Sequence, residues 1–260
     1  MEEILNCRQV SKTWYSARSE TEALRDVSFT LHSGEFVSIV GPSGDGKSTL
    51  IRLIAGLDGT TAGKIHFRES EITGIWKNCG VVFQQPRLFD YYSIFANVAF
   101  PLRIQSVPKD IRRERVMSLL GRMNLADFAD RYPHELSLGM QQRVAFARAT
   151  LLDPEVLLLD EPFASLDAQT RFLMQDFLLT YWLEQKTTTL LVTHSVDEAL
   201  LLSDRIITLT ARPGRVKSVI NVQLPRPRNP YEESFIEIKK SLEYSIREEV
   251  LASWHNDYQP

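Results

Sequence analysis

Cysteine, basic charge and long apolar runs are all scarce in this chain of 260 residues. Cys7 and Cys79 match neither metal-ligand nor redox-pair spacing, so we expect two reduced thiols that act as small apolar residues. The net charge of -3 provides no basic field that would attract nucleic acid or anionic lipid. No run approaches the roughly 20 apolar residues that span a bilayer. Any membrane role therefore depends on a partner.

The start of the chain and its composition indicate a cytoplasmic globular protein. Residues 1–6 are acidic where a secretory signal would be basic, and no apolar segment follows them, so we expect synthesis in the cytoplasm. The length, with 43% hydrophobic residues, predicts one large α/β domain that carries an insertion.

Short apolar runs alternate with segments of helical spacing. The runs predict strands at 35–40, 156–160, 188–193 and 206–209, and the spacing predicts helices at 169–183 and 196–202. This alternation is typical of an α/β fold with a largely parallel sheet covered by helices. The run at 156–160 has no polar alternation before its final acid, as expected for a strand buried on both faces.

The alternation stops between residues 87 and 152, where the pattern is mostly helical with breaks at Pro101, Pro108 and Pro133. We predict a domain over 1–220, with an inserted helical subdomain at about 88–152. The charged segment 109–115 is interpreted as a solvated helix face, with a nucleic-acid site as the alternative. A C-terminal extension, 221–260, begins with a proline-rich stretch and continues as a helix-like segment.

A glycine-rich loop follows the first predicted parallel strand. It consists of Gly41, Pro42, Ser43, Gly44, Asp45, Gly46, Lys47, Ser48 and Thr49. In the pattern G-x4-G-K-S, backbone amides close around phosphates, the lysine reaches the β and γ oxygens, and the hydroxyl binds Mg²⁺. The loop predicts ATP or GTP binding, which kinases, GTPases, motors and transport ATPases share.

Two adjacent acids, Asp160 and Glu161, end the second buried strand. Phosphoryl transfer to water needs a metal ligand and a group that orients or deprotonates the attacking water. We predict that Asp160 holds Mg²⁺ through water and that Glu161 acts on the attacking water.

The chain resembles the nucleotide-binding subunit of an ABC transporter over roughly residues 4–220. The motifs occur in the family's order: Walker A at 41–49, the Q-loop at 82–84, the signature at 136–143, Walker B at 156–161, the D-loop at 165–167 and the switch histidine at 193–194. The resemblance implies a P-loop ABC ATPase fold, ATP and Mg²⁺ as cofactors, and ATPase activity.

The resemblance also assigns roles to single residues. Lys47 and the loop amides would grip the phosphates, and Ser48 and Gln84 would contribute to the Mg²⁺ shell. His194 would contact the γ-phosphate and hold the water that Glu161 activates; a satisfied core histidine is the alternative. Trp14, or else Tyr15, falls where the family places an aromatic residue that stacks on adenine.

In the family two subunits pack head to tail, so the resemblance implies a homodimer or a pairing with a second cassette. Ser137 and the Gly139 amide would complete the γ-phosphate site of the opposite subunit. This chain has Leu138 where the family usually has glycine. Either the leucine disturbs the approach to ATP, or its backbone is ordinary helix and the side chain points away.

Four further sequence segments are similar to those of the ATP-binding subunits of importers of nitrate, sulfonate, taurine and related solutes. These segments are 82–88, 132–136, 166–171 and 224–228. The resemblance implies a peripheral subunit on the cytoplasmic side of the cell (inner) membrane, bound to integral membrane permease subunits that work with a solute-binding protein. Three alternatives are an exporter or lipid-transporter ATPase, a weakly or non-hydrolysing regulatory cassette, and a soluble ABC ATPase acting on nucleic acid or ribosomes. The last usually carries a coiled-coil insertion or tandem cassettes, and this chain has neither.

Overall fold

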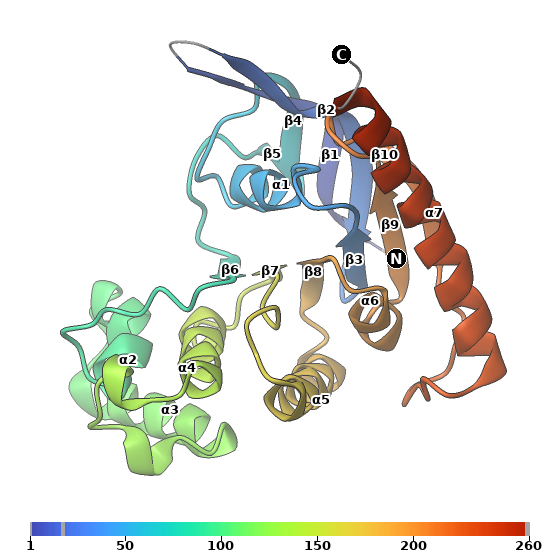
Figure 1. Cartoon of the computed structure of the whole chain (residues 1–260). Coiled ribbons are helices and arrows are strands. Elements are labelled where there is room, and N and C mark those ends of the chain that lie inside the picture. Colours follow the sequence, from blue (N-terminus) through green and yellow to red (C-terminus); the bar gives the residue numbers. More distant parts are fainter. Residues whose placement is uncertain (1, 17–18, 258–260) are drawn as a thin grey trace. The chain divides into compact units, whose positions relative to one another are not determined.

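The computed structural model describes residues 2–16 and 19–257 and divides into two compact units (Figure 1). The P-loop unit comprises residues 1–76 and 185–260, and the signature unit comprises residues 77–184. Both units contain parallel strands and helices, which confirms the predicted α/β class. The predicted boundaries near residues 88, 152 and 220 stay a prediction. Among helices within the described ranges, none is long and apolar enough to cross a membrane.

Part of the P-loop unit is an antiparallel sheet in the strand order β2-β1-β4-β5. Its strands are β1 (Glu3–Tyr15), β2 (Glu20–His32), β4 (Ala62–Phe67) and β5 (Ser70–Glu71). Leu5, Val10 and Val27 of this sheet are fully buried. This is typical of an antiparallel sheet that packs one face on the core. Cys7 is buried there too, and burial raises the pKa of its thiol. Both cysteines are free, as predicted.

The same unit holds parallel strands in the order β9-β3-β8, with β10 antiparallel beside β9. These are β3 (Phe36–Val40), β8 (Thr188–Thr193), β9 (Arg205–Leu209) and β10 (Val216–Asn221). Every residue of β3 and β8 is buried, as the apolar runs predict. Helix α1 (Lys47–Ile54) follows β3, and α6 (Val196–Leu202) follows β8.

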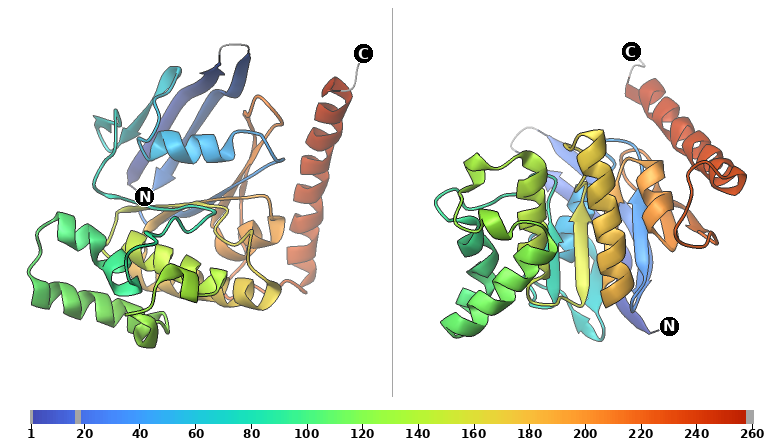
Figure 2. Two further views of the ribbon diagram at one scale, coloured as in Figure 1. Left: turned by 60° about the vertical axis from the view of Figure 1, so that its left-hand side comes forward. Right: turned by 90° about the horizontal axis from the view of Figure 1, so that it is seen from below.

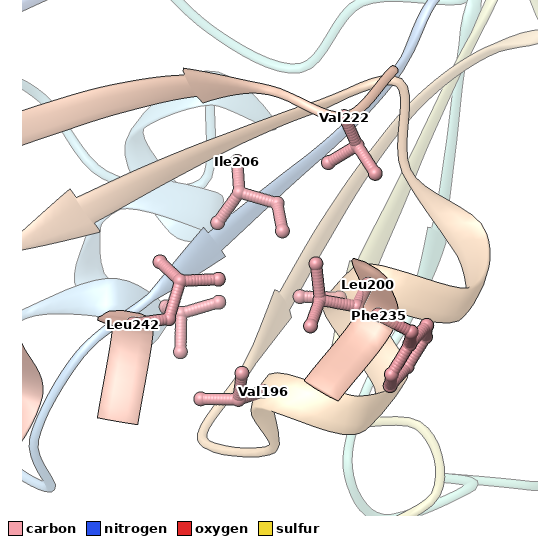
Figure 3. Packing of buried hydrophobic residues seen from close by; sticks show 8 residues of the cluster. Val196, Leu200, Ile206, Val222, Phe235 and Leu242 are labelled. Carbon is pink, nitrogen blue, oxygen red and sulfur yellow. The ribbon is translucent and has the colours of Figure 1, made fainter. Parts of the chain in front are cut away.

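The C-terminal extension packs on α6 through α7 (Glu233–Asp257), which confirms the helix-like segment predicted there. Phe235 and Leu242 of α7 join Val196 and Leu200 of α6 in one apolar cluster (Figure 3). Ahead of α7, the buried Arg228 donates hydrogen bonds to the carbonyl oxygens of residues 200, 203, 222 and 224. Burial lowers the pKa of its guanidinium to about 10. The extension is therefore part of the unit's core.

In the signature unit, β6 (Cys79–Val82) and β7 (Val156–Asp160) pair in parallel. Its helices are α2 (Ile94–Ile104), α3 (Lys109–Arg122), α4 (Leu138–Thr150) and α5 (Ala168–Gln185), with short 3-10 turns at Ala126–Phe128 and Pro133–Glu135. Helices α2, α3 and α4 pack together, as both views of Figure 2 show.

One predicted helix break is wrong. Pro108 precedes α3 and Pro133 begins a 3-10 turn, but Pro101 lies inside α2. An internal proline costs about 3 kcal/mol because it removes one backbone hydrogen bond. Val98 and Leu102, on either side of it, are completely buried. We infer that their burial offsets the lost bond, since each contributes about 1.5–3 kcal/mol.

Candidate functional site

The glycine-rich loop joins the end of β3 to the first turn of α1. Gly44 and Gly46 have φ angles of 82° and 94°, in the left-handed region that favours glycine. A Cβ on Gly46 would also lie 2.6 Å from the Ala23 carbonyl oxygen. Gly46 is the N-cap of α1 and offers no side-chain acceptor. Backbone amides in such a turn at a helix start are well suited to phosphate.

Lys47 lies buried beneath this loop, where its ammonium makes three hydrogen bonds. Nζ donates to the carbonyl oxygens of Gly41 and Pro42, each at 2.8 Å, and to Asp45 Oδ1 at 2.9 Å. The Lys47 amide donates to the same carboxylate oxygen at 3.1 Å. Ser48 follows on the exposed side of α1. The sequence pattern predicts the loop but not this contact with Asp45.

His194 lies at the end of β8, beside the strand that leads into the loop. In the parallel register Val40 lies opposite Thr193, so the loop and His194 begin at the same edge of these strands. The His194 side chain is exposed, which contradicts the alternative of a buried core histidine. Thr193 Oγ1 donates to Glu198 Oε2 at 2.5 Å and accepts from the Ser195 amide at 3.0 Å. These bonds fix the backbone on both sides of His194, and sequence reasoning missed Glu198.

The two aromatic candidates for adenine stacking lie at the far end of β1. Trp14 is 39% exposed and Tyr15 is 70% exposed, so both rings have accessible surface. Lys12 Nζ lies 4.3 Å from the centroid of the Trp14 ring. The choice between Trp14 and Tyr15 stays a prediction.

In the signature unit, the acidic pair sits where β7 ends. Asp160 is the last residue of a strand that is buried throughout, and Glu161 is partly exposed. Glu161 has a φ of 45°, an uncommon conformation for a residue with a side chain. Strained backbone of this kind costs of the order of 1–3 kcal/mol and tends to occur at functional sites. No sequence signal predicts this conformation.

The signature segment begins α4 with a side-chain cap. Ser137 Oγ accepts from the Met140 amide at 3.3 Å, as a serine N-cap does. Leu138 is the first residue of the helix and is 41% exposed, and its φ is not positive. The helical backbone expected at Leu138 is thus confirmed, and the direction of its side chain relative to ATP stays a prediction. A Cβ on Gly139 would lie 2.3 Å from Thr170 Cγ2, so glycine is needed where α4 meets α5.

Helix α4 also holds the loop that carries Gln84. Gln142 Nε2 donates to the Phe83 carbonyl oxygen at 3.0 Å, and Arg148 Nη2 donates to those of Pro86 and Arg87. The Gln84 side chain itself is exposed. Sequence reasoning missed Gln142 and Arg148, although Gln142 lies within the signature segment.

The predicted residues divide between the units. The P-loop unit brings the glycine-rich loop and His194 to one strand edge and places Trp14 on β1. The signature unit holds Gln84, Ser137, Gly139, Asp160 and Glu161. A family model described as ABC transporter matches residues 24–164, more than half of the chain. The chain belongs to the ABC transporter family. This cassette is an ATPase, with a P-loop NTPase fold.

Relatives of this ABC cassette cover nearly its whole length. An uncharacterized ABC transporter ATP-binding protein of Methanocaldococcus jannaschii is 43% identical over 96% of this chain and 93% of its own. An aliphatic sulfonates import ATP-binding protein of Bacillus cereus is 44% identical over 90% and 92%. A taurine import ATP-binding protein of Roseobacter denitrificans is 43% identical over 88% and 85%.

A solved structure agrees with the fold of the cassette. The dimeric structure of a post-hydrolysis state of an ATP-binding cassette, bound to ADP and Pi, has a TM-score of 0.76 and 31% identity. The similarity covers 85% of this chain and all of that one. The ABC ATPase fold implied by the sequence motifs is confirmed.

Proposed function

We propose that this cassette hydrolyses ATP at the cytoplasmic side of the membrane to drive import of a small solute, an anion such as nitrate, a sulfonate or taurine. The observation that carries the proposal is the glycine-rich loop, which has a turn suited to phosphate and begins at the same strand edge as the exposed His194. The similarity to the sulfonate and taurine import subunits supports the solute class.

ATP is held by Lys47, the loop amides and the aromatic residue at 14 or 15. The described loop fits this role, since its left-handed glycines turn backbone amides toward an anion. Ser48, Gln84 and Asp160 would hold Mg²⁺, with Asp160 acting through a water molecule. Hydroxyl, amide and carboxylate oxygens are the hard ligands that this ion prefers, in company with phosphates and water. The bound ion would neutralise charge on the phosphates.

Glu161 orients or deprotonates the attacking water, and His194 contacts the γ-phosphate. A carboxylate that is partly exposed at the end of a buried strand is accessible to water. Ser137 and the Gly139 amide complete the γ-phosphate site of an opposite subunit. The helical backbone at Leu138 favours an active cassette over a regulatory one, because α4 begins there without needing glycine.

The working assembly contains two cassettes, integral permease subunits and a solute-binding protein. Dimeric cassettes among the structural relatives support the pairing. The negative net charge makes nucleic acid an unsuitable partner.

Transport by a reconstituted complex tests the proposal. The tagged chain is purified with its co-purifying membrane subunits, placed in vesicles with ATP at the cassette face, and supplied with labelled nitrate, taurine and alkanesulfonates. We expect ATP-dependent uptake of one of these anions, lost in a matched complex carrying Glu161→Gln. Solute movement in the opposite direction, or ATP turnover that none of the anions and binding proteins stimulates, would contradict import.

A further inference from the structure

Asp45 places a carboxylate inside the phosphate loop. It occupies one of the four variable positions of G-x4-G-K-S, where the pattern demands no acid. The side chain is only 1% exposed, although it lies between Gly44 and Gly46 in a loop. A buried carboxylate is costly unless it is paired and hydrogen-bonded. Asp45 therefore needs strong partners.

Those partners are the donors that the loop offers to phosphate. An ammonium group has three N–H donors, and Lys47 directs one of them to Asp45 and two to the carbonyl oxygens of Gly41 and Pro42. The Lys47 amide, in the first turn of α1, also donates to Asp45 Oδ1. All three ammonium donors and one helix-start amide are engaged within the chain. A phosphate oxygen can reach Lys47 only after one of these bonds breaks.

The surrounding backbone fits closely around this arrangement. A Cβ on Gly41 would lie 2.1 Å from Asp45 Oδ2, and a Cβ on Gly214 would lie 2.0 Å from the Asp45 carbonyl oxygen. Arg212 Nε donates to the Gly44 carbonyl oxygen at 3.2 Å. The turn after β9 thus packs closely against the loop.

We propose that Asp45 is an affinity-setting residue whose carboxylate competes with nucleotide phosphate for Lys47. Without nucleotide, Asp45 takes the position of an anion in the loop. ATP or ADP binds when its phosphates displace the carboxylate, which turns out of the loop. The competition weakens binding of both nucleotides and speeds the release of ADP. This inference rests on the phosphate-binding role proposed for Lys47.

Calorimetric titration with Mg-ADP tests the competition, because ADP is not hydrolysed further at this site. The full chain is compared with Asp45→Asn and Asp45→Ser, the second providing a smaller neutral side chain if asparagine does not fit. Asp58→Asn is the matched control, because Asp58 pairs with Arg52 at 2.5 Å beyond the other end of α1. Thermal unfolding confirms that each protein is folded.

We expect at least one Asp45 variant to bind ADP about 10-fold more tightly than the wild type, since a charge-assisted hydrogen bond no longer has to be displaced. Pyrophosphate, which lacks the base, should show the same gain, and Asp58→Asn should show none. If the wild type binds ADP and both Asp45 variants bind it equally or more weakly, the competition is wrong while the nucleotide site stands. If none of the four proteins binds ADP, both proposals fail.

Discussion

Two helices of this cassette begin at loops assigned to phosphate, yet the two starts are built differently. Helix α1 follows Gly46, which has a left-handed backbone and provides no side-chain cap, and the loop closes on the buried pair of Asp45 and Lys47. Helix α4 follows Ser137, which caps the helix with its own hydroxyl and lies exposed beside Leu138. The first start is formed by backbone shape and a buried charge pair, whereas the second is capped by its own side chain and is exposed.

Glu161, the residue proposed to act on the attacking water, lies at neither helix start, and its substitution should have the largest effect. Glu161→Gln should retain ATP binding and reduce ATP turnover by about 10²- to 10⁴-fold, the usual contribution of a positioned general base. Nucleotide titration and a phosphate-release assay measure the two quantities separately. Unchanged turnover would remove Glu161 from its assigned role.

A second prediction concerns how substitutions at the starts of helices α1 and α4 change the affinity for ATP. Lys47→Ala should weaken ATP binding to the single chain by about 10- to 100-fold, because it removes charged hydrogen bonds to the phosphates. Ser137→Ala is the matched comparison at α4 and should leave this affinity unchanged, since its assigned ATP belongs to the opposite subunit. Titration of dilute protein with a fluorescent ATP analogue measures both. Equal losses in the two variants would contradict the distinction.

The close approach at α4 gives a third prediction, about stability. Gly139→Ala should lower the free energy of unfolding by about 1–3 kcal/mol, because the new Cβ overlaps the Thr170 methyl group. Thr170→Ser removes that methyl and keeps the hydroxyl that bonds Asp167 at 2.6 Å. The double variant Gly139→Ala/Thr170→Ser should regain most of the lost free energy of unfolding, as measured by urea unfolding. A Gly139→Ala protein as stable as wild type would show that the contact is not tight.

Leu138→Gly should have the smallest effect. The position is helical and its side chain is 41% exposed, so glycine gains no useful freedom and costs at most about 1 kcal/mol of unfolding free energy. The ATPase rate should stay at the wild-type level. A clear rise in rate after the substitution would mean that the leucine obstructs the signature.

Most of the fold could be predicted because it is encoded locally. The run Val156–Asp160 gives β7 with the expected bounds, and helical spacing gives α6 at Val196–Leu202. What could not be predicted depends on segments that are distant in the chain. Pro101 stays helical because of the burial around it, and Arg228 is buried because carbonyl groups at residues 200 and 203 accept its hydrogen bonds.

The site shows the same division. Residue types and spacing predict the phosphate loop, and the left-handed backbone of its glycines agrees with that prediction. The contact between Asp45 and Lys47, the positive φ of Glu161 and the hold of Gln142 on the Phe83 carbonyl arise from three-dimensional packing. A sequence motif identifies the functional groups of a site, but it does not predict the contacts that these groups make with other parts of the chain.

Light scattering on Glu161→Gln protein, with and without ATP, tests most directly whether the exposed α4 start serves a second cassette. The account predicts a monomer without nucleotide, a dimer with ATP, and no dimer when Lys47→Ala is added. A protein that binds saturating ATP yet stays a monomer, or that dimerises equally without ATP, would contradict the ATP-bridged pair.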